Sequence, residues 1–583
     1  MSYPALSDTT NPRIHLAAAA ITLVAVLIIG RLFQLMILQH DFYTALAAGA
    51  HEVYARLIPE RGAILLQDWR SGEEFPLAIN RDVFVVYADT RKIMNDETAE
   101  AVARALAEVF RYDEEKKLSL YRQLNKRTDP YEPIEPRVEE AVVEELRALD
   151  LPGIGFVRKP QRVYPEGRLA AHVIGFLGKT EAGEEVGRYG VEGYWQEELA
   201  GSGGFFAGEK SAAGRLISLA GRSVEPAENG ADIVLTLDRT LQFMACEKLA
   251  GAAKEYQASS GALVILEPKT GAIRALCSWP DFDPNNYNQV DAIEVYNNTA
   301  VFTPYEPGSI FKPITMAAAI NEGAVTPETV FHDSGSAEAR CRKPIKNAAE
   351  KSYGNQTMVG VMENSINTGL VFVIKKLGKN KFIDYVERFG FGVKEGVELD
   401  SEVSGTIESL REKSGDEVDC YAATAAFGQG ITATPLQMAT AIGVIANGGK
   451  LIKPYVVSEV RYSDGRVERT KPVEIRSVLT ARAASLVAGM MVSVVDNGQA
   501  KSARVPGYYV AGKTGTAQIP GPGGYTEDTN HSFVGFAPID DPKFVMVVKF
   551  EKPQRKYADS TAAPTFAEIA KFALQYYGVA PVR

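Results

Sequence analysis

Cysteine and histidine are scarce in this chain, which has four cysteines and six histidines in 583 residues. The four cysteines, none of which forms a C-x-x-C pair, are Cys246, Cys277, Cys341 and Cys420. This spacing indicates no disulfide framework, so free buried thiols are the default expectation. His332, Asp333 and Cys341 lie close together but lack a fourth ligand at a recognisable zinc spacing. We therefore expect neither a metal site nor a cofactor.

An excess of positive charge is also missing. Lysine and arginine number 63 against 73 aspartates and glutamates, and the net charge of −10 argues against nucleic acid as a partner. The glycine-rich stretch 201–204 lacks the G-x-x-x-x-G-K-[ST] phosphate loop, so a hairpin or loop is expected there. A hydrophobic content of 46% is that of a globular protein, long enough for several units of about 150 residues.

One long hydrophobic run stands near the N-terminus, over residues 14–38. It is interrupted by Arg31, and about 20 mostly apolar residues suffice to span a membrane if that arginine reaches an interface. The alternatives are a buried core helix or a cleaved signal peptide, whose apolar core is usually only about 7–15 residues. We expect an uncleaved anchor at 14–38 after a cytoplasmic tail at 1–13.

The first motif that suggests chemistry is a serine followed three residues later by a lysine. It lies in Glu306-Pro307-Gly308-Ser309-Ile310-Phe311-Lys312. Residues three apart share a helix face, so the Lys312 amine can approach the Ser309 hydroxyl and take its proton. That role needs a neutral lysine, kept so by burial or by a second cation. Alone, the pair is a weak signal, because such pairs recur by chance on solvated helices, which is the commoner case.

Two further motifs follow in the chain. Ser365-Ile366-Asn367 comes first, and Lys513-Thr514-Gly515-Thr516 lies in a later strand of small residues. Taken separately, they indicate helix-capping residues and a solvated strand lysine. A second Lys-Thr-Gly, at 269–271, precedes Ser309 and falls in a predicted turn, so we do not expect it in the site.

The local patterns also predict secondary structure. Helices are expected where apolar residues recur on one face, and strands where β-branched runs are bounded by turn residues. The helices are 97–110, 137–149, 240–253 and 563–577; the strands are 83–87, 232–237, 262–267, 272–277, 531–537 and 543–550.

The three motifs, in this order, resemble the active-site set of the penicillin-binding protein and serine β-lactamase superfamily. Arg61-Gly62-x-Ile64, Arg162-Val163-Tyr164-Pro165 and Gly190-x-x-Gly193 resemble the pedestal of its class B, monofunctional, high-molecular-weight members. Ser365-Ile366-Asn367 departs from the Ser-Asp-Asn usual in class A β-lactamases, which counts against that branch. Ile310 stands where many relatives have threonine. No stretch resembles the glycosyltransferase module of class A penicillin-binding proteins.

The resemblance implies an α+β fold. The expected architecture is a penicilloyl-serine transferase domain at 229–583, with an antiparallel sheet and a helical subdomain. An elongated α+β pedestal of the penicillin-binding protein dimerisation type precedes it at 39–228, after the single transmembrane helix.

The resemblance also implies a peptidoglycan D,D-transpeptidase that binds β-lactams covalently. Ser309 would be the nucleophile and Lys312 the general base, with Ser365 as proton relay, Asn367 on the substrate amide and Lys513 as second cation. Three residues would bind the substrate: Thr514, Gly515 and Thr516.

The expected partners are peptidoglycan stem peptides, β-lactams and a multi-span glycosyltransferase of the shape, elongation, division and sporulation (SEDS) family. The expected location is the plasma membrane, with the catalytic domain outside the cytoplasm. The alternative is a membrane-anchored β-lactam sensor or a non-catalytic scaffold for division or elongation. Which of elongation and division the protein serves stays open at this point.

Overall fold

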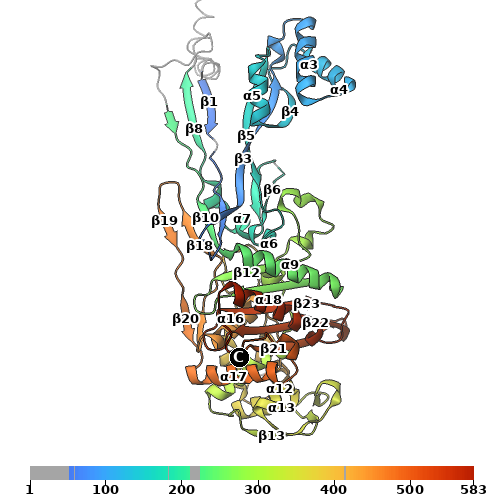
Figure 1. Ribbon diagram of the computed structural model, residues 1–583, viewed down its shortest axis with the longest axis vertical. Helices are drawn as coiled ribbons and strands as arrows, with labels where there is room; N and C mark the ends of the chain where they lie inside the picture. The colour runs from blue at the N-terminus through green and yellow to red at the C-terminus, as the bar shows by residue number, and fades with distance from the viewer. Residues whose placement is uncertain (1–51, 58, 182, 210–222, 413–414) are drawn as a thin grey trace, which may run out of the picture. The chain divides into compact units, whose positions relative to one another are not determined.

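The structure is a computed structural model, which describes residues 52–57, 59–181, 183–209, 223–412 and 415–583 (Figure 1). The expected tail and membrane anchor lie outside the described residues. Within the described ranges, none of the helices combines the length and the apolar character that crossing a bilayer requires.

The chain forms two compact units. The smaller one comprises the described parts of residues 1–59 and 201–229, and its core is a three-stranded antiparallel sheet. Its strands, in the order β1-β8-β9, are β1 (Glu52–Leu57), β8 (Gly204–Glu209) and β9 (Ser223–Glu225).

The larger unit, residues 60–200 and 230–583, is built on a five-stranded antiparallel sheet. The strand order is β12-β11-β23-β22-β21. The strands are β11 (Ser260–Leu266), β12 (Ile273–Trp279), β21 (Ala511–Gly521), β22 (Gly524–Ala537) and β23 (Phe544–Glu551). Both predicted hairpins are confirmed, and the second Lys-Thr-Gly lies in the β11–β12 turn as expected.

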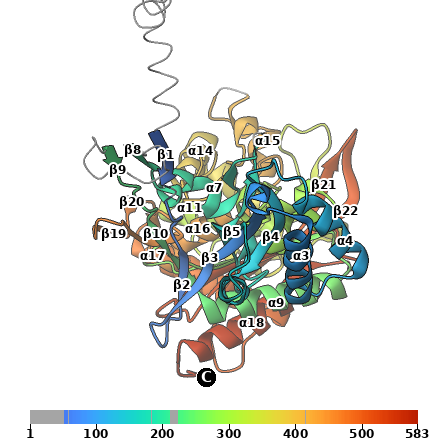
Figure 2. The same cartoon turned by 90° about the horizontal axis from the view of Figure 1, so that it is seen from above.

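Helices cover the two faces of this sheet (Figures 1 and 2). One face packs against α9 (Arg239–Glu255) and α18 (Ala562–Tyr576), and the other against α16 (Pro435–Ala446). The sequence determines where these helices begin: the Asp238 side chain accepts from the Leu241 N–H, and Thr434 forms a capping box with Gln437. The helices predicted over 240–253 and 563–577 are confirmed.

A helical subdomain stands next to the β21 edge of the sheet. Its helices contact one another, and α17 contacts β21. They are α11 (Lys312–Asn321), α12 (Met358–Glu363), α13 (Asn367–Leu377), α14 (Lys379–Arg388), α15 (Cys420–Ala425) and α17 (Ala481–Asp496). The observed α+β architecture agrees with the expected class.

The N-terminal part of the larger unit has a core of its own. Phe84, Val102, Leu106 and Leu146 are among its buried side chains. The strands that enclose it are β3 (Glu74–Ala88), β4 (Glu132–Glu139) and β5 (Ile154–Val163); the helices are α3 (Asp96–Phe110), α4 (Glu114–Leu124) and α5 (Glu140–Ala148). A mixed sheet runs from these strands through β2 (Ile64–Gln67) to β10 (Asp232–Asp238), which pair in parallel.

The helix predicted over 137–149 is wrong at its N-terminal end. Residues 137–139 belong to β4, where Val138 pairs with Phe84 across the ladder, and α5 starts only at Glu140. Pairing with β3 buries Val138 in the core of this part of the unit. Tertiary pairing therefore overrides the helical periodicity.

The expectation of free thiols is also wrong. Two disulfides join Cys246 to Cys277 and Cys341 to Cys420. The partners are 31 and 79 residues apart in sequence, with Cα atoms 5.4 and 4.8 Å apart. Packing of α9 on β12 brings the first pair together, so the pairing follows from tertiary structure and not from local spacing.

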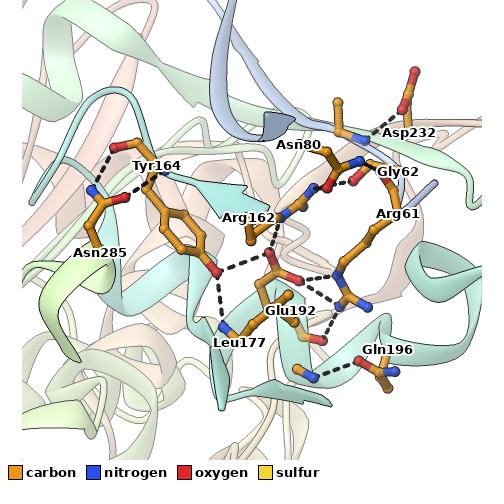
Figure 3. A network of polar contacts seen from close by, with 12 residues as sticks. Arg61, Gly62, Asn80, Arg162, Tyr164, Leu177, Glu192, Gln196, Asp232 and Asn285 are labelled. Carbon is orange, nitrogen blue, oxygen red and sulfur yellow. Dashed lines mark hydrogen bonds and ion pairs between the residues drawn. The ribbon is translucent and has the colours of Figure 1, made fainter. Parts of the chain in front are cut away.

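A buried carboxylate joins segments that are far apart in the chain (Figure 3). Glu192, fully buried, accepts from Arg61 Nε at 2.7 Å and from Arg162 Nε at 2.8 Å. Burial raises the pKa of Glu192, but the opposing charges of Arg162 and Arg61 outweigh it and hold that pKa below its usual value. The Asp232 carboxylate accepts from the Ala63 N–H at 2.6 Å and so ties β10 to the same region.

Replacing Glu192 with glutamine should destabilise the protein by roughly 3–5 kcal/mol, because the buried Arg162 and the partly buried Arg61 lose their counter-charge. The midpoint of urea unfolding measures this loss. The control is Glu139→Gln, which removes the exposed ion pair with Arg81 and should have little measurable effect. Equal midpoints for the two variants would contradict the assigned role of Glu192.

Candidate active site

Three chain segments bring the predicted site residues together. Ser309 lies in the 3₁₀ turn η5 (Gly308–Phe311), which continues directly into α11 at Lys312. Ser365 stands in the turn between α12 and α13, with a left-handed φ of +55°. Lys513 lies on β21, the edge strand of the five-stranded sheet.

These segments enclose a cavity of about 550 Å³. Five of the eight predicted residues line it: Ser309, Ser365, Asn367, Thr514 and Thr516. Lys312 and Lys513 are fully buried behind the wall, and Gly515 continues the strand between the two threonines. The structure therefore places all eight predicted residues in or directly behind one cavity wall.

The two lysine amines meet at the Ser365 hydroxyl. Lys312 Nζ donates to Ser365 Oγ at 3.0 Å, to the Ser365 carbonyl at 2.6 Å and to Asn367 Oδ1 at 2.8 Å. Lys513 Nζ also lies 3.0 Å from Ser365 Oγ, and it donates to the Thr514 carbonyl at 3.0 Å. A proton can therefore pass between either amine and the serine hydroxyl.

Burial changes the acid–base properties of both amines. Burial and, second, the charge of Lys513 lower the pKa of Lys312 well below its ordinary value. Burial also lowers the pKa of Lys513 to about 7. Lys312 is therefore both buried and close to a second cation, either of which can keep its amine neutral. An amine of this kind can act as a general base near neutral pH.

Ser309 is partly exposed at the cavity wall. The hydrogen-bond acceptors of the Lys312 amine in the described structure belong to Ser365 and Asn367, and Ser309 is not among them. Catalytic hydrogen bonds often tighten only when substrate binds, so the geometry of the free enzyme remains compatible with proton transfer from Ser309.

Glycines allow β21 to approach the turn that carries Ser309. A Cβ on Gly515 would lie 3.0 Å from the Pro307 carbonyl and 2.7 Å from Ser532 Oγ. Gly308 has φ +58°, and a Cβ there would lie 2.9 Å from the Ala517 side chain. The glycine of Lys-Thr-Gly is therefore needed where strand and turn meet.

The rest of the cavity wall was missed by sequence reasoning. It comprises Asn347, Ala348, Ala349, Lys351, Tyr353, Asn364, Gln499, Tyr557, Ala558 and Asp559. Most of these residues come from loops without a motif, and only the fold brings them to the site. One of these loops is tied to a predicted residue: the Ala558 N–H donates to Thr516 Oγ1 at 3.1 Å and so fixes the loop before α18 to β21.

The grouping of His332, Asp333 and Cys341 has another structural explanation. Asp333 accepts from Thr368 Oγ1 at 2.6 Å and from Asn347 Nδ2 at 2.8 Å, and Cys341 is bonded to Cys420. Among the residues that the structure describes, no group of three or more potential ligands could hold a metal ion.

Comparisons with known proteins identify the family of both domains. Residues 261–571 match the penicillin-binding protein transpeptidase domain, and residues 56–235 match the penicillin-binding protein dimerisation domain. The chain is 35% identical to stage V sporulation protein D of Bacillus subtilis, over 90% of this chain and 79% of that protein. It is 27% identical to a probable peptidoglycan D,D-transpeptidase, PbpC, of Pseudomonas aeruginosa, over 99% and 97%.

Solved structures show the same fold. Penicillin-binding protein 2X of Streptococcus thermophilus superposes with a TM-score of 0.78 at 22% identity, over 90% of this chain and 80% of that chain. Penicillin-binding protein 3 of Mycobacterium tuberculosis, in complex with aztreonam, superposes with 0.68 at 26% identity, over 91% and 98%. With both domains matched and the three motifs gathered around one cavity, the chain belongs to the class B penicillin-binding proteins.

Proposed function

We propose that this protein cross-links peptidoglycan as a serine-type D,D-transpeptidase with Ser309 as its nucleophile. The observation that carries the proposal is the placement of two buried lysine amines on one serine hydroxyl, beside the cavity that Ser309 lines. A solvated helix pair would leave both amines in water with ordinary pKa values.

In the first half of the reaction, Ser309 Oγ attacks the carbonyl of the penultimate D-alanine, and Lys312 takes the hydroxyl proton. The backbone N–H groups of Ser309 and Thr516 stabilise the oxyanion; losing one such donor typically costs about 100- to 1,000-fold in rate. The C–N bond then breaks, and Ser365 passes a proton to the departing D-alanine amine. The product is an acyl-enzyme.

Substrate recognition uses the remaining predicted residues. The terminal carboxylate of the donor peptide binds Lys513 with the hydroxyls of Thr514 and Thr516, since hydrogen bonds to a charged partner are the strong ones. Gly515 leaves room for this approach. The Asn367 side chain holds a donor amide. β-Lactams carry a similar carboxylate and acyl carbon, so they acylate the same serine.

In the second half, an amine of a neighbouring stem peptide attacks the acyl-enzyme and releases Ser309. The test uses uncross-linked glycan strands that carry pentapeptides. Wild-type protein should release one D-alanine for each cross-linked dimer that it forms. Release of D-alanine without any dimer would instead indicate a carboxypeptidase, and no release from a protein that binds penicillin would favour a sensor.

The pH dependence of acylation should be bell-shaped. A neutral Lys312 is lost as pH falls, whereas a charged Lys513 is lost as pH rises through about 7. The ratio kcat/KM reports these groups in the free enzyme. The control is a donor stem peptide whose terminal carboxylate is amidated. Its binding gains nothing from a charged Lys513, so the fall of kcat/KM at high pH should disappear for this peptide. An identical alkaline limb for both donors would contradict the role of Lys513.

The proposal includes location and partners. A single helix at 14–38 anchors the chain in the plasma membrane, with the pedestal at 39–228 and the transpeptidase domain at 229–583 outside the cytoplasm. A SEDS-family glycosyltransferase supplies the glycan strands and contacts the anchor and the pedestal. Co-purification with a variant that has a foreign anchor tests this contact, and undiminished pairing would argue against the anchor's part in it.

A further inference from the structure

A second cavity, of about 500 Å³, lies outside the active site. It opens in the pedestal-like part of the larger unit, where β5 passes the short helix η3 (Pro284–Gln289). None of its lining residues lines the active-site cavity. Its volume falls within the range of about 300–1,000 Å³ typical of small-molecule sites.

The walls of this cavity are strongly basic. Four cationic side chains line it, against the single carboxylate of Glu185; we call the cavity the basic pocket and define it by Arg137, Lys159, Arg162 and Lys179. The whole chain carries a net charge of −10, so the local excess of positive charge runs against the overall balance. A concave surface lined by one sign of charge concentrates ions of the opposite sign.

Three of the four cations have no partner among the residues that the structure describes. Arg137, Lys159 and Lys179 are exposed, and in the part of the chain that the structure describes their side chains form neither a hydrogen bond nor an ion pair. Most other exposed cations of β3 to β5 are paired: Arg81 binds Glu139, and Arg158 binds Glu60 and Asp82. The basic pocket thus brings three cations without a described partner together on one wall.

The fourth cation, Arg162, is buried and incompletely satisfied. Its side chain is 3% exposed, and it donates from Nε to Glu192 and from Nη1 to the Gly62 carbonyl at 2.8 Å (Figure 3). Its Nη2 is buried and has no acceptor among the described residues. A buried donor without a partner is energetically unfavourable, most of all on a charged group, so hydrogen bonding is incomplete at this part of the pocket wall.

We propose that the basic pocket binds the free carboxylates of uncross-linked peptidoglycan stem peptides. Guanidinium and ammonium groups are the usual partners of carboxylates, and arginine can bind them through two parallel hydrogen bonds. The choice of a stem peptide rests on the proposed function, because the enzyme meets such peptides at its active site. A phosphate group of another wall polymer shares the chemistry, and the test separates the two sources.

The basic pocket shares part of its wall with the hydrogen-bond network around Glu192. Tyr164, Leu177 and Asn285 line the pocket and also belong to the network in Figure 3. The Leu177 N–H donates to the Tyr164 hydroxyl at 2.9 Å, and that hydroxyl lies 3.3 Å from Glu192. Asn285 bonds the Tyr164 backbone in both directions at 2.9 Å. Hydrogen bonds to the surroundings of Glu192 therefore hold this part of the pocket wall in place.

The test is calorimetric titration of the full-length protein after its active site has been acylated with penicillin. The first probe is the tripeptide L-Ala-γ-D-Glu-L-Lys, which has two free carboxylates and lacks the D-Ala-D-Ala terminus. Its bis-amide is the matched negative probe, and inorganic pyrophosphate is the second anionic probe. We expect the tripeptide to bind and the bis-amide not to bind.

The pocket variant is the double substitution Arg137→Glu and Lys159→Glu, and it should weaken tripeptide binding at least about 10-fold, since a charge-assisted contact is worth about 1.5–3 kcal/mol. The control is Arg104→Glu, an exposed arginine of α3 outside the pocket, which should bind as the wild type does.

The outcomes are distinct. Loss of binding in the pocket variant alone would support the proposal. Binding of pyrophosphate without binding of the tripeptide would overturn the assignment to stem peptides, and equal binding by both variants, or no binding of either probe, would overturn the site. Penicillin acylation of Ser309 is measured on the same samples, so failure of the basic pocket is distinguishable from failure of the proposed function.

Discussion

Replacing Ser309 with alanine should lower the rate of cross-linking by at least about 10⁴-fold. Alanine removes the only oxygen of that side chain, so no acyl-enzyme forms, and the rest of the site can contribute only binding and oxyanion stabilisation. The fold should survive, because Ser309 is partly exposed at the cavity wall. The measurement is dimer formation from pentapeptide-bearing glycan strands.

The matched control for this variant is Ser352→Ala. Ser352 is an exposed serine between two residues that line the cavity, but it does not line the cavity itself. This variant should cross-link at the wild-type rate. A Ser309→Ala protein that keeps a tenth of wild-type activity would exclude Ser309 as the nucleophile.

Replacing Lys312 with methionine should slow acylation by about 100- to 10,000-fold, the usual contribution of a general base. Methionine keeps an unbranched apolar stem in a fully buried position but removes the amine. The measurement is the second-order rate of acylation by penicillin across a range of pH. An exposed lysine on α13 provides the control, Lys376→Met, which should leave the rate unchanged.

The pH profile separates catalysis from structure in the Lys312→Met protein. If Lys312 is the base, the decline at low pH should vanish together with the rate, because the group that titrates is gone. Loss of the amine also removes the donor to Ser365 Oγ and Asn367 Oδ1, and that change alone would lower the rate while the decline at low pH persists. Persistence of the decline would assign Lys312 a positioning role.

Local patterns were sufficient to predict much of the catalytic fold. The hairpins β11–β12 and β22–β23 have strongly apolar strands with turn residues between them, so both the strands and the turns can be recognised in the sequence. Helices α9 and α18 likewise follow their apolar stripes. The candidate site residues could be predicted because each motif is contiguous in the sequence and the three motifs follow one another in the order of the family that they resemble.

Features that depend on distant contacts could not be predicted in this way. The disulfide between Cys341 and Cys420 spans 79 residues, and no local spacing distinguishes it from other pairings. Residues 137–139 follow a helical period but form a strand, because β3 offers a ladder and a core. Tyr353 and Tyr557 reach the cavity on loops without a motif. The basic pocket combines residues of several strands with η3.

The most direct test of the central claim is intact-mass spectrometry of the protein with penicillin, followed over hours and combined with peptide mapping. The account predicts a single adduct, located on Ser309 and absent from the Ser309→Ala protein. The adduct should be long-lived, because the acyl-enzyme of a transpeptidase reacts with an amine and only slowly with water. An adduct of equal yield on the Ser309→Ala protein, or one that hydrolyses within seconds, would contradict it.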